Sequence, residues 1–504
     1  MRHALTSDDR IDARQHTGPG SLDDLFRRAA ERTPAAWALV DPPDRAHFTD
    51  VAPRRLTYAD ADRAIEAVAD RLLNLGLAPG SIVALQMPNV VESVIALLGV
   101  LRAGMIAAPM PLLWRQADAV AALARLAPRA LIIVGRVGAV DHGEIVIHVA
   151  AEIFSVRFVC GFGGELPDGV IPLDGAFDVA RAPAPSRPNA IPPQHVAVVT
   201  FDVTAKGIVA VRHSHAELVA AGNAIVAEAA LAPGSAMLGA LATSSFAGLG
   251  SLIIPWLITG GRLALHQPFS PEAFLAQLND EHCETAVVPA AILAPMQEAG
   301  LLGNASALHA VLAVWRSPEF LSASAAWPNA APVCIDVAAF GEAGMIARRR
   351  GPDGIPPAIP LGPLGPAASI EVARTATGTL ALRGPMVPAG LAAGVEPGDP
   401  RSLRIDPEGF VDTEYPCRLD RESNTLIVSG PPAGLINVGG YRFAWRELQD
   451  LLAELGEGGS LAALPDRLAG HRLAGVAADP ERIRSALAAR GVNPLLLAAF
   501  RDRH

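Results

Sequence analysis

The sequence predicts an α/β fold with a large N-terminal domain of helix-flanked sheets and a small C-terminal α+β domain. Three observations lead to this prediction. The chain has 504 residues, 51% of them hydrophobic, which is more than one core usually holds. Short apolar runs alternate with amphipathic segments, a pattern typical of parallel sheets covered by helices. The pattern changes after Gly430-Pro431-Pro432, so we expect domains over residues 1–429 and 430–504.

Local signals then predict the elements in order. Ser21 is a favourable N-cap, and apolar residues follow it at helical spacing. Helices are expected over residues 21–32, 59–75, about 90–102, 445–455 and 480–490. Strands are expected over residues 56–58, 81–87, 106–109, 130–134, 145–149, 196–200 and 473–477, with a hairpin over 435–443. Segments rich in Gly and Pro predict loops over residues 161–193, 351–366 and 384–399.

Composition and charge exclude several classes of protein. The net charge of −10 argues against a nucleic-acid binder, which needs a basic face. The basic run at residues 348–350 is short, and we expect it in a solvated loop or turn. The apolar stretches are too short to cross a bilayer, and residues 1–10 lack an apolar signal core. The four cysteines show no paired spacing. We therefore expect a soluble, cytoplasmic protein with no nucleic-acid partner and no membrane span.

Lys206 is the sole lysine of the chain, and it lies in the segment Thr200-Phe-Asp-Val-Thr-Ala-Lys-Gly207. The scarcity of lysine is typical of a base-composition bias. Its position is still informative, because a lysine is a compact point charge and an arginine a planar fork. Lys206 is therefore either a chance survivor or a position where an arginine would not serve. A structural interpretation of the segment is a connection between strand and loop that carries one salt-bridged lysine.

Several segments along most of the chain carry further recognisable motifs. His213 and His215 follow the Lys206 segment at short spacing. The other segments are Val83–Asn89, Leu241–Gly248, Val288–Ala291, Ala339–Gly344, Asp406–Asp420, Leu435–Phe443 and Trp445–Gln449. Together they resemble the AMP-forming adenylate enzymes, the superfamily of acyl-CoA synthetases, luciferases and peptide-synthetase adenylation domains. The match over 435–449 is the most specific of these.

The resemblance implies ATP or AMP and Mg²⁺ as cofactors, with CoA or a carrier phosphopantetheine as the thiol acceptor. It implies catalytic roles for Lys206 at the β and γ phosphates and for Glu342 as a magnesium ligand. Phe340 would stack on adenine, Tyr415 would contact the ribose, and the Gly439–Gly440 hairpin would serve the thiol step. The implied cofactor-binding set is Thr200, Thr204, Lys206, Phe340, Gly341, Thr413, Tyr415, Gly439 and Gly440. The implied acid pocket is Ser244, Ser245, Phe246 and Gly248.

The same residues allow structural interpretations. Glu342 would then be a surface glutamate after a buried Phe340, and Ser244 and Ser245 would serve packing. His213 and His215 are expected in structural or solvent-facing roles.

The sequence departs from the family pattern at charged positions. The Lys206 segment lacks the glycines that turn backbone N–H groups onto phosphates, and Asp202 adds a negative charge there. Tyr415 stands where the family has an aspartate that accepts both ribose hydroxyls. The hinge arginine position falls on Gly430 or Pro431, and no lysine follows Lys206. Loss of one such electrostatic contact costs roughly 10²–10³ in rate.

Two hypotheses follow. In the first, the protein activates a carboxylic acid as an acyl-adenylate, with impaired efficiency, and passes it to CoA or a carrier thiol. In the second, it is a catalytically degenerate acyl- or nucleotide-binding or regulatory protein on the same fold. The expected partners are a small carboxylic acid or acyl thioester and an acyl carrier protein.

Overall fold

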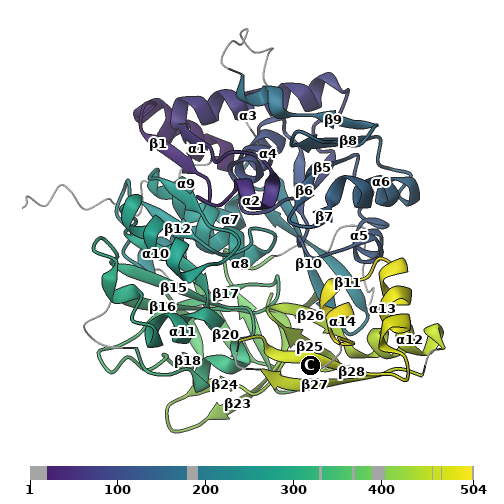
Figure 1. Ribbon diagram of the computed structural model, residues 1–504. Helices are drawn as coiled ribbons and strands as arrows, with labels where there is room; N and C mark the ends of the chain where they lie inside the picture. Colours follow the sequence, from purple (N-terminus) through teal and green to yellow (C-terminus); the bar gives the residue numbers. More distant parts are fainter. Residues whose placement is uncertain are drawn as a thin grey trace, which may run out of the picture.

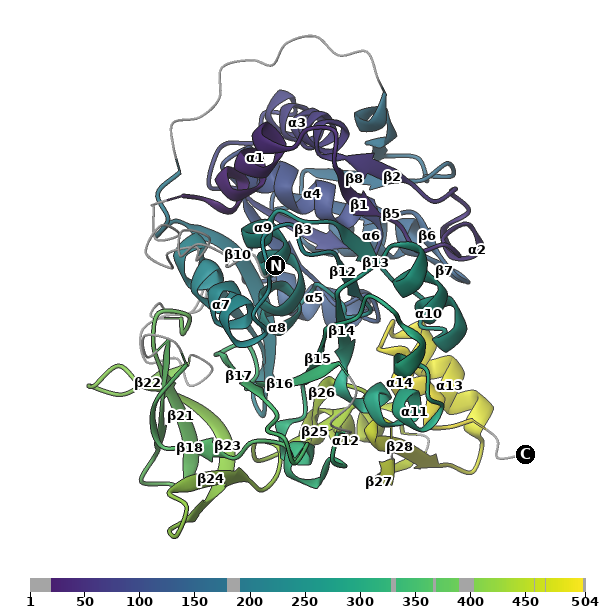
Figure 2. The ribbon, with the colours of Figure 1, turned by 90° about the vertical axis from the view of Figure 1, so that its left-hand side faces the viewer.

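A computed structural model of the chain describes residues 20–178, 191–327, 332–365, 369–388, 403–456, 458–466 and 468–501. Two large sheets, a third antiparallel sheet and a separate C-terminal sheet make up the molecule (Figure 1). Figure 2 shows the third sheet and the C-terminal part at the same end of the molecule. Among the described residues, no helix is both long and apolar enough to cross a membrane.

The first sheet is seven-stranded, in the order β11-β10-β4-β3-β5-β8-β9. β10 and β11 form an antiparallel hairpin at one edge, and the other pairs are parallel. Its strands are β3 (Ile82–Gln86), β4 (Ile106–Pro109), β5 (Ala130–Val134), β8 (Phe158–Phe162), β9 (Val170–Pro172), β10 (Val196–Thr204) and β11 (Gly207–Ser214).

The second sheet is eight-stranded, in the order β17-β16-β15-β14-β12-β13-β1-β2, with antiparallel pairs at its two edges. Its strands are β1 (Trp37–Val40), β2 (Arg55–Thr57), β12 (Met237–Gly239), β13 (Leu263–Leu265), β14 (Thr285–Pro289), β15 (Ala310–Trp315), β16 (Val333–Ala339) and β17 (Met345–Arg349). A small pair, β6 (Arg136–Val137) and β7 (Val140–Asp141), lies apart from both sheets.

Helices cover both large sheets. They are α1 (Leu22–Arg32), α2 (Ala46–Thr49), α3 (Tyr58–Asn74), α4 (Val91–Arg102), α5 (Gln116–Leu123), α6 (His142–Glu152), α7 (His215–Glu228), α8 (Phe246–Gly248), α9 (Ile254–Thr259), α10 (Pro271–Asp280) and α11 (Leu293–Glu298). Shorter turns are the 3-10 helices η3 (Asp174–Phe177), η5 (Ala290–Ile292), η6 (Leu302–Asn304) and η7 (Pro318–Ala323) and the π-helix η4 (Leu249–Ile253).

The main core lies between the two large sheets. Alternate residues of a strand point to opposite faces, so Val83 and Leu85 face this core whereas Ala84 faces a second cluster. The main core also contains strand residues of the second sheet such as Leu312. Every residue of α4 is buried, as its uninterrupted apolar run from Val94 to Leu101 leads one to expect, and its charged residues Glu92 and Arg102 form ion pairs.

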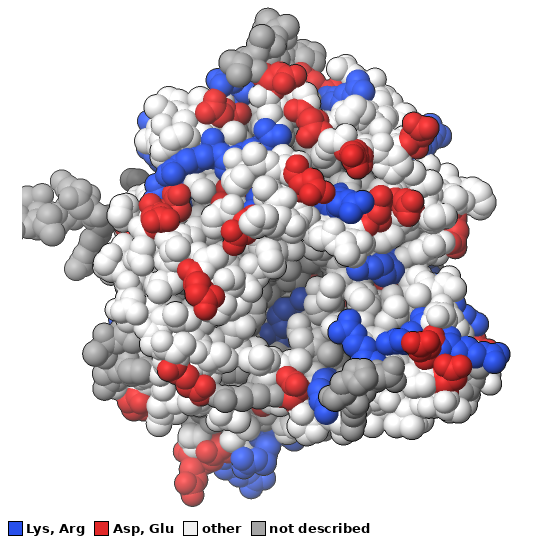
Figure 3. All heavy atoms as spheres, viewed as in Figure 1, with Lys and Arg blue, Asp and Glu red and all other residues white. Residues whose placement is uncertain are grey.

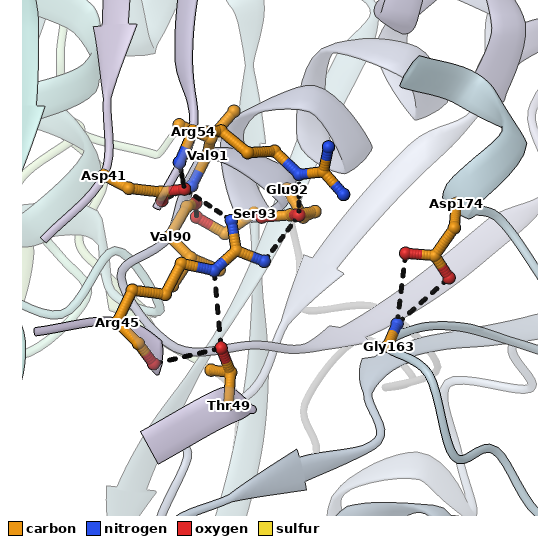
Figure 4. A network of polar contacts seen from close by, with 10 residues as sticks. All are labelled: Asp41, Arg45, Thr49, Arg54, Val90, Val91, Glu92, Ser93, Gly163 and Asp174. Atoms are coloured by element: carbon orange, nitrogen blue, oxygen red, sulfur yellow. Dashed lines mark hydrogen bonds and ion pairs between the residues drawn. The ribbon is translucent and has the colours of Figure 1, made fainter. Parts of the chain in front are cut away.

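A buried ion network fixes the start of α4 to the end of β1 (Figure 4). Asp41 accepts a hydrogen bond from the Val91 N–H at 2.7 Å, and Arg45 pairs with both Asp41 and Glu92. Arg54 Nε lies 2.9 Å from Glu92 Oε1. Figure 4 also shows Asp174 accepting from the Gly163 N–H, at 3.0 Å from Oδ2. Asp41 thus places a carboxylate at a helix N-terminus, where the backbone dipole favours it.

The third sheet runs β18-β24-β23-β21-β20-β19, with β22 paired to β23. Its strands are β18 (Ile359–Pro360), β19 (Gly362–Leu364), β20 (Ile370–Arg374), β21 (Thr379–Arg383), β22 (Arg404–Ile405), β23 (Val411–Asp420) and β24 (Thr425–Val428). The loop predicted over 351–366 therefore contains the short strands β18 and β19, and the loop predicted over 161–193 contains β9 and the turn η3. Residues 179–190, 366 and 389–399 of the predicted loops lie outside the described ranges.

The C-terminal part has a four-stranded sheet of its own, in the order β26-β25-β28-β27. Its hydrophobic cluster runs from Ile436 to Phe500. Its elements are β25 (Leu435–Val438), β26 (Tyr441–Ala444), α12 (Trp445–Leu455), β27 (Ser460–Asp466), β28 (Gly470–Val476), α13 (Pro480–Ala489) and α14 (Pro494–Ala498). We call residues 435–500 the small domain, and its boundary at 430 stays our proposal.

Two local predictions were wrong. The strand expected over 145–149 is part of α6, because Asp141 caps that helix through the Glu144 N–H at 3.0 Å. The apolar residues there follow helical spacing rather than strand alternation. The basic run at 348–350 is not wholly in a solvated turn, because Arg350 is 6% exposed and pairs with Asp336 at 2.8 Å.

Candidate functional site

The segment around Lys206 is a hairpin turn. β10 and β11 pair up to Thr204 and Gly207, so only Ala205 and Lys206 connect the strands. The Thr204 hydroxyl donates to the Gly207 carbonyl at 3.0 Å and accepts from the Lys206 N–H at 3.2 Å. Lys206 is exposed at the tip. The turn therefore uses the Thr204 hydroxyl that the sequence assigned to a phosphate.

Thr200 and Glu342 meet at the base of this hairpin. The Thr200 hydroxyl lies 2.7 Å from His213 Nε2 and also hydrogen-bonds Glu342, which accepts the Phe246 N–H at 2.6 Å. The His213 ring stacks on Phe246 with ring centroids 4.8 Å apart. Thr200, Glu342 and His213 Nε2 are thus engaged by other protein groups, whereas His213 Nδ1 is buried without a hydrogen-bond partner among the described residues.

Burial changes the protonation of both titratable groups at this base. It raises the pKa of Glu342 to about 7, with the Asp202 carboxylate adding to the shift and Arg316 opposing it. Burial alone lowers the pKa of His213 to about 3. Glu342 is consequently a weak carboxylate ligand near neutral pH, and His213 is a neutral structural ring.

Arg442 of β26 reaches across from the small domain into the same region. Its Nη1 lies 2.6 Å from Asp202 Oδ1, and its Nη2 donates to the Tyr415 hydroxyl. The guanidinium carbon lies 5.1 Å from the centre of the Tyr415 ring. Asp202 also accepts the Glu342 N–H at 3.1 Å. These contacts form one group, Asp202–Arg442–Tyr415, which we call the Arg442 latch.

The aromatic residues predicted to hold adenine and ribose are packed against the latch. Phe340 and Tyr415 are 1% and 0% exposed, with ring centroids 5.4 Å apart in an edge-to-face arrangement. Gly341 has φ +61°, and a Cβ there would lie 2.1 Å from Asp202 Oδ2. Glycine is therefore required for Asp202 and Arg442 to approach this close. Thr413 donates to the Leu380 carbonyl at 2.7 Å.

Three cavities border the predicted site. A cavity of about 40 Å³, lined by Glu342, Gly341 and the Asp202–Arg442 pair, has room for a few water molecules only. A cavity of about 380 Å³ is lined by Thr204, Lys206, Phe340, Thr413 and, again, the Asp202–Arg442 pair. The largest, about 740 Å³, lies between the second sheet and the small domain, and we call it the interface cavity.

Most of the acid pocket predicted from the sequence does not border the interface cavity. Ser244 lines a separate space of about 20 Å³, and Ser245 caps α8 by accepting the Gly248 N–H at 3.1 Å. Phe246 is fully buried under His213. The interface cavity is instead lined by neighbours such as Leu241 and residues 289–294.

The Gly439–Gly440 hairpin does line the interface cavity. Both glycines have positive φ, +57° and +79°, as a two-residue hairpin turn requires.

The predicted magnesium site lacks ligands in this arrangement. Mg²⁺ prefers several oxygen ligands in octahedral geometry. Glu342 accepts internal hydrogen bonds, and its neighbour Asp202 is paired with Arg442. Over the described ranges, no group of three or more His, Cys, Asp or Glu side chains could hold a metal ion. The residues present do not fit the ion here, so no step is assigned to it.

Sequence reasoning did not single out Arg442 or Arg316. One signal for Arg442 was available: Asp202 adds a negative charge to an apolar strand, and a partly buried carboxylate is stabilised by a nearby cation. Arg442 follows the Gly439–Gly440 hairpin within the best-matched segment, but 240 residues separate it from Asp202. The pairing itself could not be deduced without the fold.

Comparisons with known proteins agree with this architecture. A 2-hydroxy-7-methoxy-5-methyl-1-naphthoate–CoA ligase of Streptomyces carzinostaticus is 27% identical over 92% of this chain and 85% of its own length. The long-chain fatty acid transport protein 1 of Rattus norvegicus is 30% identical over 36% of this chain, and the chain spans only 27% of that protein.

Among solved structures, the amide bond synthetase McbA from Marinactinospora thermotolerans superposes with a TM-score of 0.71, at 19% identity and 94% coverage of both chains. MbtA from Mycobacterium smegmatis gives 0.67 at 20% identity, covering 96% of this chain and 91% of its own. These likenesses show the same fold. A family profile described as AMP-binding enzyme matches residues 26–331, more than half of the sequence, and the chain therefore belongs to the AMP-binding enzyme family.

Proposed function

We propose that this protein acts on a carboxylic acid or its acyl thioester, bound in the interface cavity, as an acid–thiol ligase of its family with impaired adenylation. CoA or a carrier phosphopantetheine would be the thiol partner. The observation that best supports this proposal is the difference in volume between two cavities. About 740 Å³ is open beside the Gly439–Gly440 hairpin, whereas about 40 Å³ is open beside Glu342. Pockets of roughly 300–1,000 Å³ hold small organic ligands.

The proposal of impaired adenylation rests on the contacts around Glu342 and Arg442. Glu342 and Asp202 are both engaged by protein groups, so neither is available to a metal–triphosphate complex in this arrangement. Tyr415, at the ribose position, is buried beneath Arg442. Lys206 is the only lysine that could contact a phosphate. Preorganised contacts of this kind usually supply the largest share of catalysis.

A second candidate is ATP-dependent acyl-adenylate formation with the cavity of about 380 Å³ as the nucleotide site. Lys206, Thr204, Phe340 and Thr413 line it, as the resemblance implies for cofactor-binding residues. The relative matched over 92% of this chain is named a CoA ligase. In this candidate the small domain would rotate and withdraw Arg442 from Asp202.

The two candidates predict different results with ATP. Under the first candidate, isothermal titration of the full chain should show only weak binding of ATP with Mg²⁺, and pyrophosphate release should be slow across a panel of aliphatic and aryl acids. Arg442→Ala tests the role of the latch, and Arg446→Ala is the matched control because its side chain is 88% exposed in α12. Binding of acids and acyl-CoA is followed through the fluorescence of Trp315, which lines the interface cavity.

The outcomes separate the candidates. Tight ATP binding with rapid pyrophosphate release by the unmodified chain would favour the second candidate, and loss of that release in Lys206→Ala would support a nucleotide site beside Lys206. Tighter ATP binding by Arg442→Ala than by the unmodified chain would support the latch as the obstacle. Absence of any response to acids or acyl-CoA would contradict a ligand site in the interface cavity.

A further inference from the structure

The interface cavity opens at the carboxyl ends of parallel strands. β12, β14 and β15 are neighbours in the second sheet, with Gly239 opposite Val287 and Pro289 opposite Val314. The residues that follow these strands, including Ala240, Ala290 and Arg316, line the cavity. The carboxyl edge of a parallel sheet is the usual place for ligands in α/β folds. Arg316, directly after β15, is thus built into the edge where a ligand would sit.

The lining of this cavity is predominantly apolar, with Arg316 as its cation among the described residues. Leu241, Leu293, Val314 and Phe320 supply apolar surface. Arg316 also borders the space of about 40 Å³ beside Glu342, so it stands where the apolar cavity meets the family's reaction site. A ligand whose polar head group binds Arg316 would have its apolar body in the interface cavity.

The Arg316 guanidinium is held by stacking rather than by an ion pair. Its carbon lies 5.8 Å from the centre of the Tyr441 ring, a cation–π contact with the small domain. In the part of the chain that the structure describes, no carboxylate lies within ion-pair distance of Arg316, in contrast to Arg442, Arg350 and Arg45. Its N–H donors are therefore available to a ligand in the cavity.

The nearest acidic groups have other partners. Glu342 accepts the Phe246 N–H at 2.6 Å and hydrogen-bonds Thr200. Asp466, on the small-domain wall, accepts the Leu468 and Ala469 N–H groups at 2.9 and 2.8 Å. Glu298 borders the cavity but is exposed to solvent at the end of α11. None of these carboxylates lies within ion-pair distance of Arg316, although its charge acts on Glu342 and opposes the rise in the pKa of that group.

From this arrangement we infer that Arg316 binds the carboxylate of an apolar acid whose body fills the interface cavity. The inference rests on the proposed function and names its ligand as the free acid. A guanidinium fork matches a carboxylate with two parallel hydrogen bonds, which gives geometry as well as charge. A single half-buried cation in an apolar wall suits one negative charge better than the double charge of a phosphate. Arg316 thus supplies a positive charge for the acid in a chain that has no lysine beyond Lys206.

The test uses the full chain and two acids of different shape, octanoate and naphthoate, with octanamide and naphthamide as neutral matches. Binding is measured by titration calorimetry and Trp315 fluorescence. We expect Arg316→Gln to weaken binding of the acids roughly tenfold to hundredfold, since hydrogen bonds to charged groups are worth that much. Binding of the amides should not change. Arg316→Lys keeps the charge without the fork and should give an intermediate loss.

Arg212→Gln, at an exposed position of β11, is the matched control for loss of one arginine charge. Thermal unfolding checks that each variant is folded, and if Arg316→Gln is not, Arg316→Lys carries the comparison. Equal effects of Arg316→Gln on acids and amides would overturn the assignment but leave the interface cavity as an apolar ligand site. Displacement of octanoate by inorganic phosphate would overturn it in favour of a phosphate site. If neither acids nor amides bind the unmodified chain, the proposed function fails as well.

Discussion

Glu342 shows how burial changes the chemistry that a carboxyl group can perform. Its side chain is enclosed by the β10–β11 hairpin, α8 and the Arg442 latch, and burial raises its pKa to about 7. In the unfolded chain the group titrates near 4.5. The folded state therefore binds this proton more tightly than the unfolded state. The stabilisation is complete below pH 4.5 and is lost as the pH rises through 7.

We expect Glu342→Gln to be more stable relative to the unmodified protein at pH 8 than at pH 5. The amide keeps the shape of a protonated carboxyl and needs no charged form. A pKa difference of this size corresponds to about 3 kcal/mol between the two pH values. Urea unfolding at both pH values measures it. Glu422→Gln, at an exposed turn, is the control, with an expected change under about 0.5 kcal/mol. A pH-independent difference for Glu342→Gln would contradict the enclosed position of this group.

The sequence was sufficient to predict which site residues lie close together. It was not sufficient to predict how much space is left between them for a ligand. Thr200 and Glu342 do meet, as do Phe340 and Tyr415. The sequence motifs are those of a fold that the family shares, and the fold determines which side chains are neighbours. Whether a nucleotide fits between them depends on Arg442, which comes from the small domain and is held by the partly buried Asp202 carboxylate and the Tyr415 hydroxyl. Such long-range pairs carry no local signal.

At the level of elements, the ion network at the start of α4 is a buried arginine paired with two buried carboxylates, and only Glu92 Oε2 among its carboxylate oxygens has no hydrogen-bond partner in the described residues. Arg45 is 1% exposed and contacts Asp41, Glu92 and Thr49. These residues come from the end of β1, from α2 and from α4. Removing one partner of a buried ion pair leaves the other charge uncompensated, which costs more than the pair itself contributes.

Arg45→Ala should therefore destabilise the large domain by about 3–5 kcal/mol. Arg136→Ala is the matched control, because Arg136 and its partner Asp50 are 52% and 76% exposed and 3.9 Å apart. Exposed pairs contribute roughly 0–1 kcal/mol. Urea unfolding followed by far-ultraviolet circular dichroism distinguishes the two variants. Similar losses in both would show that burial of the network contributes little.

Helices with a capping residue and clear apolar spacing were predictable from the sequence. Short apolar segments, whose structure depends on neighbouring residues, were not. The helix expected over 445–455 matches α12, and Ser21 caps α1 with a capping box. The segment 145–149 was assigned to a strand because its apolar residues are β-branched. Asp141 supplies a helix cap just before it. A short apolar run is compatible with both states, and its neighbours decide.

Across the whole molecule, two sets of buried groups respond to pH in opposite directions. In each set, burial is the main cause of the shift. It raises the pKa of Asp41 and Asp118 to about 6 and that of Glu342 to about 7. It lowers the pKa of His142 and His215 to about 4 and that of His213 to about 3. Acidification thus favours folding through the first set and unfolding through the second.

We expect the urea midpoint to change little between pH 6 and pH 4.5, because three groups of each kind oppose one another there. The histidines alone would lower stability by about 4 kcal/mol per pH unit in this interval. Asp118→Asn removes one of the opposing carboxyl groups. The free energy of unfolding of this variant should therefore fall on acidification. Midpoints at several pH values in this interval measure the slope. A steep loss in the unmodified chain would mean that the carboxyls do not hold their protons.

The interface cavity has walls from both domains, with Arg316 on one side stacked against Tyr441 on the other. Occupancy of the cavity and docking of the small domain are therefore linked equilibria, and linkage is reciprocal. Any factor by which docking tightens the binding of an acid is the same factor by which the acid tightens docking. The Arg442 latch acts on the docking equilibrium although Arg442 itself does not line this cavity. Residues far from the acid can thus tune its apparent affinity by setting the population of the docked state.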